Sequence, residues 1–262
     1  MVPSIHTNRG TKRARTARTD LGLGLDAPVP DLLEAVEGPG AAHVVVLDLG
    51  EGVAGAYLAR PGCPLIFVNG RQVSGRRRFT LAHEFGHHRI GHGTVVDSPS
   101  DMADYDHDPQ EVEANAFAAE FLVPRQAVEA WGARRLRGQP GLDDVVTLAA
   151  EYGVSAQMVR YRLETCGVLS DLSLRTKLDE EIAEQLHLKL ADDLGLGDLD
   201  DGLARAASRL PRIPPTLRSS RFGELLAGEL DPEGFAARTG QDPAAVGRML
   251  ANLGLDEMVV SA

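Results

Sequence analysis

Two histidines and a glutamate have the types and the spacing of a metal-dependent hydrolytic site. His83 and His87 stand four residues apart in the sequence FTLAHEFGHH, so a helix would place both imidazoles on one face, one turn apart. Glu84 lies between them, beside the position at which a metal would hold a water molecule. This His-Glu-x-x-His pattern is the core of a zinc peptidase, but five residues also match by chance, so the surroundings must support it.

The third ligand of such a site is not a nearby histidine. A catalytic zinc uses three protein ligands and keeps the fourth position for water. Gly93 stands where the extended HExxHxxGxxH pattern would place its third histidine, and His92 is out of register by one residue. We therefore interpret His88 and His92 as residues that support the site or lie on the surface.

A glutamate from a second helix is the other source of a ligand. The segment Gln110–Leu122 is predicted to be helical, with one proline just before it and another just after it. We choose Glu111 as the ligand, because Asn115 lies on the same face and its amide can orient a histidine ligand. Glu113 is the alternative; it lies about 160° around the helix from Glu111, so only one of the two should face the metal.

The expected chemistry is hydrolysis of a peptide bond. Zinc would lower the pKa of a bound water toward about 7 and polarise the scissile carbonyl. Glu84 would take the water proton as general base and deliver it to the leaving amine. A further donor should stabilise the oxyanion. We prefer Tyr161, because its helix is expected to pack beside the protease half; the alternatives are Tyr105, His107 and His88.

The segments before the motif predict a small sheet of three strands, at residues 43–49, 55–59 and 64–68. The motif helix is expected over Ser74–Ile90, ended by glycines. Residues 94–108 form a polar loop whose five aspartates we expect to be solvated, although they could bind a second cation. The predicted fold class is α+β, mostly helical: a minimal zincin domain with its sheet, motif helix and glutamate helix, followed by helical units.

Four parts are expected along the chain. Residues 1–27 form a basic tail that we expect to be disordered, because its first 18 residues carry five Lys or Arg and no acidic residue. Residues 28–136 form the zincin-like metallopeptidase domain, and residues 137–170 a helix-turn-helix-like unit. Residues 171–262 form a helical C-terminal region with a second such unit, because the pattern of residues 148–153 recurs 87 residues later.

The composition of the chain distinguishes between soluble, membrane-spanning and secreted proteins. The chain has 262 residues, a net charge of -11 and 43% hydrophobic residues, as in soluble globular proteins. No run of about 18 apolar residues predicts a membrane span, and the N-terminus lacks the apolar core of a signal peptide. Cys63 and Cys166 are isolated from each other, so we expect free thiols in a reducing compartment and a cytoplasmic protein.

Two linked motifs carry a family resemblance. RRFTLAHEFGH follows the strand IFVN, and EVEANAFAAEFLVP comes later, followed by Val154-Ser155. Together they resemble the ImmA/IrrE family of bacterial and phage metallopeptidases over about residues 28–169. The resemblance implies a gluzincin-like domain followed by a helix-turn-helix-like unit. It also implies site-specific cleavage of helix-turn-helix repressors, which derepresses stress-response or mobile-element genes.

The resemblance also implies roles for particular residues. The zinc ligands would be His83, His87 and Glu111, with Glu84 catalytic. Asn115 stands where the thermolysin-like pattern has an aspartate. The region after about residue 170 does not resemble the sensor domain of the radiation-response members, so no activating signal is implied.

The leading hypothesis is a zinc endopeptidase that acts on a partner transcription factor. The alternative is a DNA-binding or toxin–antitoxin regulator with a vestigial protease domain. The helix-turn-helix-like segments 143–169 and 231–256 each carry four acidic residues and two arginines. A DNA reader needs excess positive charge, so we interpret both segments as packing or partner-docking units. Direct DNA binding is therefore not expected, and an acidic surface could attract a basic repressor.

Overall fold

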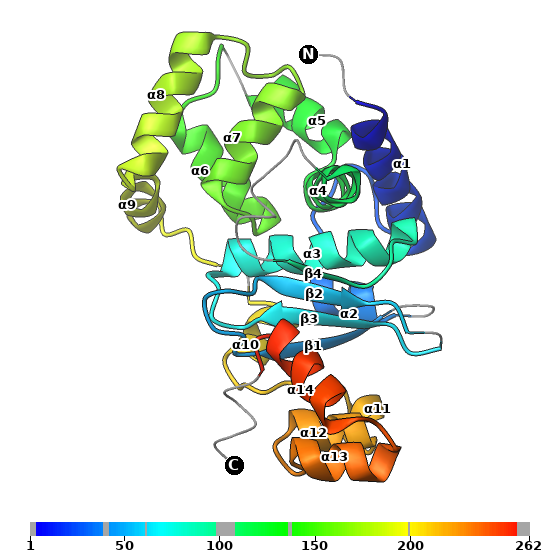
Figure 1. Ribbon diagram of the computed structural model, residues 1–262. Helices are drawn as coiled ribbons and strands as arrows, with labels where there is room; N and C mark the ends of the chain where they lie inside the picture. The colour runs from blue at the N-terminus through cyan, green and yellow to red at the C-terminus, as the bar shows by residue number, and fades with distance from the viewer. Residues whose placement is uncertain are drawn as a thin grey trace.

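The protein is described by a computed structural model that covers residues 4–38, 42–60, 62–97, 108–135, 138–198 and 200–255. A four-stranded sheet lies between two groups of helices, with the strand order β1-β3-β2-β4 (Figure 1). β1 and β3 are parallel, and β2 is antiparallel to both β3 and β4. The strands are β1 (His43–Leu47), β2 (Gly55–Leu58), β3 (Leu65–Asn69) and β4 (Val95–Asp97).

The mostly helical α+β fold class is confirmed, and one strand is additional to the prediction. The three predicted strands are present, but Val95–Asp97 pairs with β2 instead of belonging to a solvated loop. A strand of three residues is too short to show the alternation of apolar and polar residues that reveals strands in a sequence. Its last residue, Asp97, is only 1% exposed, so the expectation that it is solvated is wrong.

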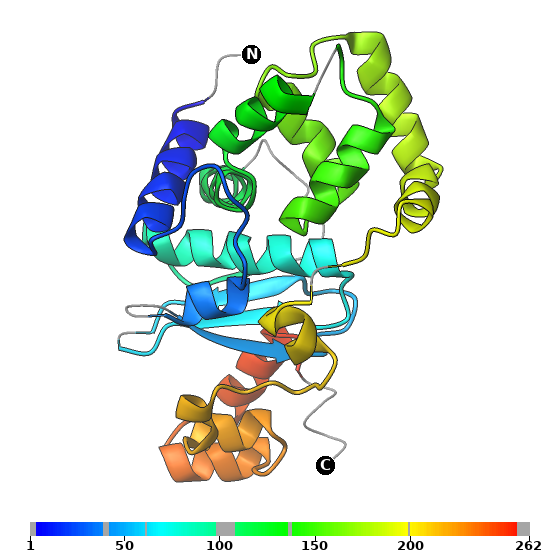
Figure 2. The same cartoon turned by 180° about the vertical axis from the view of Figure 1, so that it is seen from behind.

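Both faces of the sheet are covered, which explains why its strands are almost continuously apolar. On β1, Val44 and Val46 point into the core shared with the motif helix, whereas Val45 and Leu47 point into a second core. The second core is completed by the C-terminal helices, which lie on the opposite side of the sheet from the N-terminal helix (Figure 2). The sheet therefore belongs to both cores of the protein.

The motif helix α3 (Ser74–Ile90) lies on one face of the sheet, and α4 (Pro109–Leu122) packs on α3. Both helices occupy almost the predicted residues. Gly86 allows the close approach, because a Cβ there would lie 3.1–3.2 Å from atoms of Phe117 on α4. Gly91 ends α3 in a left-handed conformation with φ of 88°. The two helices thereby bring their polar residues face to face.

The N-terminal segment contradicts the prediction of a disordered tail. Residues Ile5–Asp20 form helix α1, which begins at the capping side chain of Ser4 and packs along α4. Ala14 and Ala17 are completely buried in this contact. The basic, polar sequence of this segment suggested a disordered tail for two reasons. The residues that pack against α4 are small, and the carboxylates that pair with Arg9 and Arg15 are distant in the sequence.

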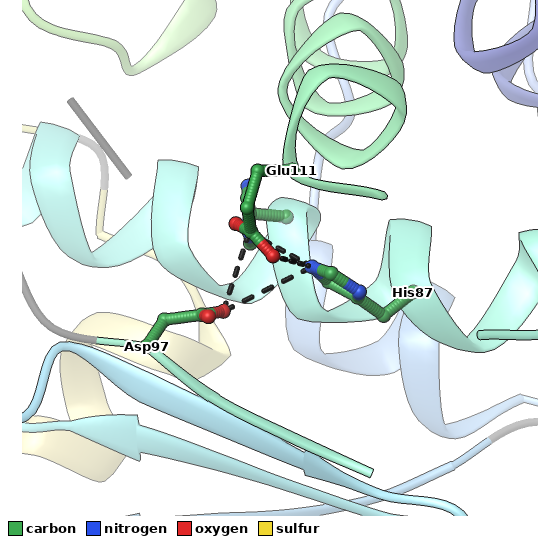
Figure 3. A group of neighbouring side chains, drawn as sticks. His87, Asp97 and Glu111 are labelled. Atoms are coloured by element: carbon green, nitrogen blue, oxygen red, sulfur yellow. Dashed lines mark hydrogen bonds and ion pairs between the residues drawn. The ribbon is translucent and has the colours of Figure 1, made fainter. Parts of the chain in front are cut away.

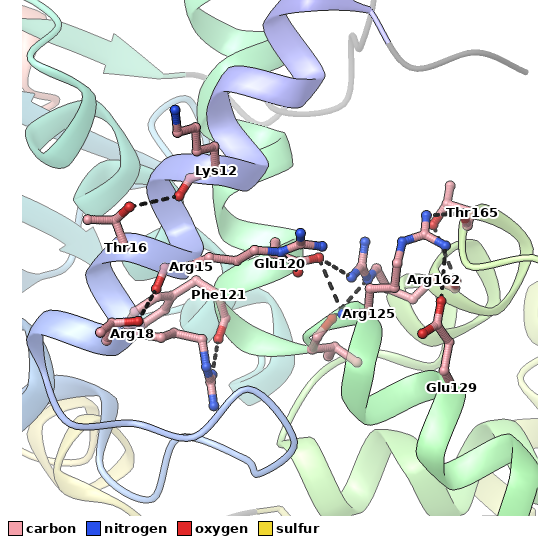
Figure 4. A network of polar contacts seen from close by, with 12 residues as sticks. Lys12, Arg15, Thr16, Arg18, Glu120, Phe121, Arg125, Glu129, Arg162 and Thr165 are labelled. Atoms are coloured by element: carbon pink, nitrogen blue, oxygen red, sulfur yellow. Dashed lines mark hydrogen bonds and ion pairs between the residues drawn. The ribbon is translucent and has the colours of Figure 1, made fainter.

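Glu120 of α4 is the centre of one such network (Figure 4). Its carboxylate is 2.8 Å from Nε of Arg15 on α1 and 2.7 Å from Nη2 of Arg162. Arg18, which is fully buried, donates hydrogen bonds to the carbonyl oxygens of Phe121 and Gly24. Arg15 and Arg18 of α1 thus bind groups of the protein itself, one a carboxylate and the other carbonyl oxygens.

Two helices, α6 (Leu142–Tyr152) and α7 (Ala156–Thr165), occupy the segment predicted to resemble a helix-turn-helix. Gly153, in a left-handed conformation, ends α6, and the side chain of Ser155 caps α7. The other helices of this region are α5 (Arg125–Arg135), α8 (Leu172–Ala183) and α9 (Leu186–Asp193).

The chain then returns to the sheet and crosses to its other face. Asp201 caps α10 and pairs with Arg78 of α3, and both side chains are buried. The second predicted helical pair is present, with Gly240 left-handed between its helices. None of the described helices is long and apolar enough to cross a membrane. The remaining helices are α2 (Leu32–Glu37), α10 (Gly202–Ala207), α11 (Pro215–Arg218), α12 (Arg221–Leu226), α13 (Pro232–Thr239) and α14 (Pro243–Asn252).

Candidate metal centre

Four buried side chains converge between α3, α4 and β4 (Figure 3). Helix α3 places His83 and His87 on one face, α4 contributes Glu111, and Asp97 reaches in from the end of β4. One donor atom from each lies within 4.8 Å of the others. The sequence predicted three members of this cluster, and it did not predict Asp97.

The distances between these donors fit a tetrahedral metal ion. Nε2 of His83 is 3.0 Å from Nε2 of His87, 3.1 Å from Oε2 of Glu111 and 3.3 Å from Oδ2 of Asp97. Nε2 of His87 is 3.4 Å from Oε1 of Glu111 and 3.9 Å from Oδ2 of Asp97. Donors around a tetrahedral zinc lie about 3.3–3.6 Å apart when the zinc–donor bonds are 2.0–2.2 Å.

The chemistry of the cluster fits a metal as well. Oδ2 of Asp97 and Oε2 of Glu111 are both buried and face Nε2 of His83, which can compensate their charge only when it is protonated. A buried carboxylate without a donor is costly unless a cation compensates its charge. Two imidazole nitrogens and two carboxylate oxygens form a donor set that zinc accepts.

Asn115 and His83 are joined as the spacing on α4 predicted. Oδ1 of Asn115 is 3.0 Å from Nδ1 of His83. An amide oxygen can only accept, so Nδ1 of His83 carries the hydrogen and donates it. The lone pair of Nε2 is then left for a metal.

His87 is held by a longer chain of contacts, in which His92 supports the site, as one of the two alternatives for that residue expected. Its Nδ1 is 2.9 Å from Nδ1 of His92, and Nε2 of His92 is 3.1 Å from Oε2 of Glu113. Glu113 also accepts from His6 at 2.9 Å and pairs with Arg9 at 3.0 Å, both on α1. Glu113, the alternative ligand, therefore faces His92 and α1 and lies outside the four-residue cluster.

In the absence of a metal, the charged groups of the cluster shift one another's pKa values. Burial by itself lowers the pKa of His83, but the hydrogen bonds and charges of Asp97 and Glu111 outweigh burial and raise it to about 9. Burial and the neighbouring charged His83 hold the pKa of His87 well below its usual value. Burial, followed by the charge of Asp97, raises the pKa of Glu84 well above its usual range.

Glu84, the predicted general base, is completely buried beside the cluster. Neither of its carboxylate oxygens has a hydrogen-bond donor among the residues that the structure describes. Gly55 of β2 leaves room for this carboxylate, because a Cβ at Gly55 would lie 2.5 Å from Oε1 of Glu84. The Glu84 carboxylate therefore lies close to the carboxylates of Asp97 and Glu111, whose charges add to the effect of burial on its pKa.

The predicted oxyanion donors are less closely tied to the cluster. Tyr161 lies on α7, is 45% exposed, and has the guanidinium of Arg160 at 4.8 Å from its ring centre. Its catalytic role stays a prediction. His88 is 3.0 Å from the hydroxyl of Tyr57, and Tyr105 and His107 lie outside the described residues.

Asp97 was missed because local spacing does not show that the chain after the motif helix returns to the cluster as a strand. The sequence offers one weak local signal, which is that the aspartate directly follows two valines after Thr94. Such a run could mark a short strand, but the run does not indicate which face of the sheet the aspartate joins.

Comparison with known proteins supports the assignment of this centre. A search of curated proteins found no match. Residues 41–164 match the family of the IrrE N-terminal-like domain, within the M78 peptidases. The matched residues contain α3, β4 and α4, and therefore all four donors. Residues 41–164 are thus similar to the peptidase domain of the ImmA/IrrE family.

Proposed function

We propose that the protein is a zinc-dependent endopeptidase that cleaves a partner helix-turn-helix repressor and so controls stress-response or mobile-element genes. The observation that carries the proposal is the convergence of His83, His87 and Glu111 on one point, with Glu84 next to His83 on the same helix. The peptidase family of the domain supports the same reaction.

The ligands in this proposal are His83, His87 and Glu111. When bound there, zinc would supply a Lewis acid that polarises the scissile carbonyl and activates water. Glu84 accepts the proton of the attacking water and delivers it to the leaving amine. No described residue donates a hydrogen bond to either oxygen of its carboxylate, which supports this role. Asn115 keeps His83 in the tautomer that leaves Nε2 for the metal.

The preference for a protein substrate over DNA follows from α7, which would be the recognition helix of the first helix-turn-helix-like unit. Arg162 of α7 is paired with Glu120, and Arg160 pairs with Glu164 and Asp179. Both arginines are buried and neutralised within the protein, so they are not available for phosphates. The first unit is therefore suited to packing or to docking a repressor. We also expect a cytoplasmic protein in which Cys63 and Cys166 remain free thiols.

The first experiment measures metal content and cleavage in parallel. The wild-type protein should bind about one zinc ion per chain, and H83A or E111A should lose it. E84Q should keep the zinc and lose cleavage of the partner. Full cleavage by E84Q would overturn the mechanism.

The second experiment identifies the substrate. Wild-type protein and E84Q are expressed in parallel in the cell, and the helix-turn-helix proteins that disappear only with the wild type are identified by mass spectrometry. We expect one small repressor to be lost. A wild-type protein that shifts DNA at physiological salt without a partner would favour the alternative of a DNA-binding regulator.

A further inference from the structure

We propose that Asp97 is a fourth protein ligand that closes the metal centre, so that the conformation described here holds a metal but excludes a substrate. This inference rests on the proposed function, because it assigns a further residue to the same metal site. The sequence motifs give no role to Asp97, and its position is known only from the tertiary structure.

The position of Asp97 is that of a ligand. Its Oδ2 is 3.3 Å from Nε2 of His83 and 3.9 Å from Nε2 of His87. These separations resemble those of Glu111, whose oxygens lie 3.1 and 3.4 Å from the same two nitrogens. Asp97 is also more deeply buried than Glu111, at 1% against 8% exposure. Asp97 is thus slightly farther from the two histidines than Glu111, but it is more deeply buried and lies within reach of the same metal position.

A fourth protein ligand changes what the centre can do. Catalytic zinc sites have three protein ligands and an open position, whereas sites with four protein ligands are closed and structural. With His83, His87, Glu111 and Asp97 bound, a tetrahedral zinc has no position left for water or for a peptide carbonyl. Cleavage would then require Asp97 to leave the metal.

Strand β4 is suited to release Asp97. It is an edge strand of the sheet, it has three residues, and among the described strands it pairs with β2 alone. Asp97 itself is held by the backbone hydrogen bond from Ala54 to its carbonyl oxygen, at 2.8 Å. In contrast, all five residues of β3 are buried, and β3 pairs on both sides. Edge segments with few buried contacts open at lower free energy than core strands, so β4 can shift while the helical ligands stay in place.

The test compares D97A and D97N with V96N. Val96 lies on the same strand and is 36% exposed, so V96N alters β4 without altering the cluster. Zinc affinity is measured by competition with a chromophoric chelator. We expect D97A and D97N to bind zinc at least about tenfold more weakly than the wild type, and V96N to bind it equally well. D97N keeps the volume of the side chain, and thermal melting of the metal-free proteins checks folding.

Cobalt spectra test whether the centre is closed. The Co²⁺-loaded wild type should have the absorption of a site with four protein ligands, and added azide should leave that spectrum unchanged. The spectrum of Co²⁺-loaded D97A should change with azide, because removal of the carboxylate opens a position. A wild-type spectrum that responds to azide as D97A does would overturn the proposal. Equal zinc affinity of D97A and V96N would overturn it as well.

The cleavage assay separates this proposal from the proposed function. At saturating zinc, D97A should cleave the partner repressor several-fold faster than the wild type. Slower cleavage by D97A with unchanged zinc affinity would assign Asp97 to catalysis and overturn the proposal. If neither form cleaves any partner while D97A loses zinc affinity and gains the azide response, the proposed function fails and the assignment of Asp97 as the closing ligand stands.

Discussion

Nδ1 of His92 lies 2.9 Å from Nδ1 of His87, on the side of that ring opposite to the metal centre. Nε2 of His92 is in turn 3.1 Å from the carboxylate of Glu113, which can only accept. The hydrogens can therefore be placed in one direction, from His87 to His92 and from His92 to Glu113. This arrangement leaves Nε2 of His87 without a hydrogen, as a metal ligand requires.

The first prediction concerns this chain of contacts. H92A should weaken zinc binding by about 10–100-fold, because His87 loses the acceptor that fixes its tautomer and ring orientation. The dissociation constant is measured by competition with a chromophoric chelator. H88A is the matched control: His88 is next to His87 in the sequence but contacts Tyr57. An equal loss of affinity in both variants would show that His92 has no particular role.

The second prediction concerns the release of a proton from His83 when zinc binds. Because Asp97 and Glu111 raise the pKa of His83 to about 9 in the metal-free protein, His83 is protonated at neutral pH. The stability from its ion pairs is fully present below the ordinary pKa of 6.5 and is lost as the pH rises through about 9. Zinc must displace this proton, so zinc binding at about pH 7.5 should release about one proton, and zinc affinity should rise with pH up to about 9.

Calorimetry measures this release. Zinc is titrated into the metal-free protein in two buffers with different ionisation enthalpies, and the difference between the observed enthalpies gives the number of protons released. The same titration of H83A is the control, since it should show little binding. Identical enthalpies in the two buffers would exclude a protonated His83.

The third prediction tests the docking of α1 on α4. A Cβ at Gly10 would lie 2.1 Å from the carbonyl oxygen of Glu113, so G10A should destabilise the protein by about 1–3 kcal/mol. Gly247 of α14 has no atom within 4 Å of its Cβ position. G247A should therefore stabilise by about 0.5–1 kcal/mol through helix propensity. Both changes are measured by urea unfolding, and a stabilising G10A would mean that α1 does not pack as described.

The fourth prediction concerns the ion pair between Arg78 and Asp201, which joins α3 to the start of α10. Both side chains are buried, and Arg78 also donates to the carbonyl of Val29 at 3.1 Å. R78A should cost about 3–5 kcal/mol of unfolding free energy, because it leaves the carboxylate of Asp201 buried without its partner. R221A removes the pair with Glu224, in which Arg221 is largely exposed, and should cost less than about 1 kcal/mol. Similar losses in the two variants would contradict the burial of the first pair.

The spacing of residues along the chain explains why the two ligand-bearing helices could be predicted. The helix over Ser74–Ile90 and the shared face of His83 and His87 follow from the helical period, which the chain carries in any context. The helix that presents Glu111 and Asn115 was predictable for the same reason, together with its flanking prolines. The angular offset of Glu113 from Glu111 likewise indicated that only one of them would join the cluster.

The N-terminal helix could not be predicted from its own residues. The basic residues between Arg9 and Arg18 suggest a solvated tail when they are read alone. Their partners, Glu113 and Glu120, lie about 100 positions later in the chain. Contacts over such sequence separations leave no periodic signal in either segment.

The sequence by itself determined the pair of histidines, the glutamate between them and the helix that carries the third ligand. The reason is that the spacing of residues along a helix fixes which side chains share a face. Only the tertiary structure decided that Asp97 enters the same cluster and that His92 contacts His87. Those two relationships depend on how β4 pairs with β2 and on how the chain leaves α3 at Gly91. Strand pairing and chain direction after a turn are set by the packing of the whole domain, which no short stretch of sequence contains.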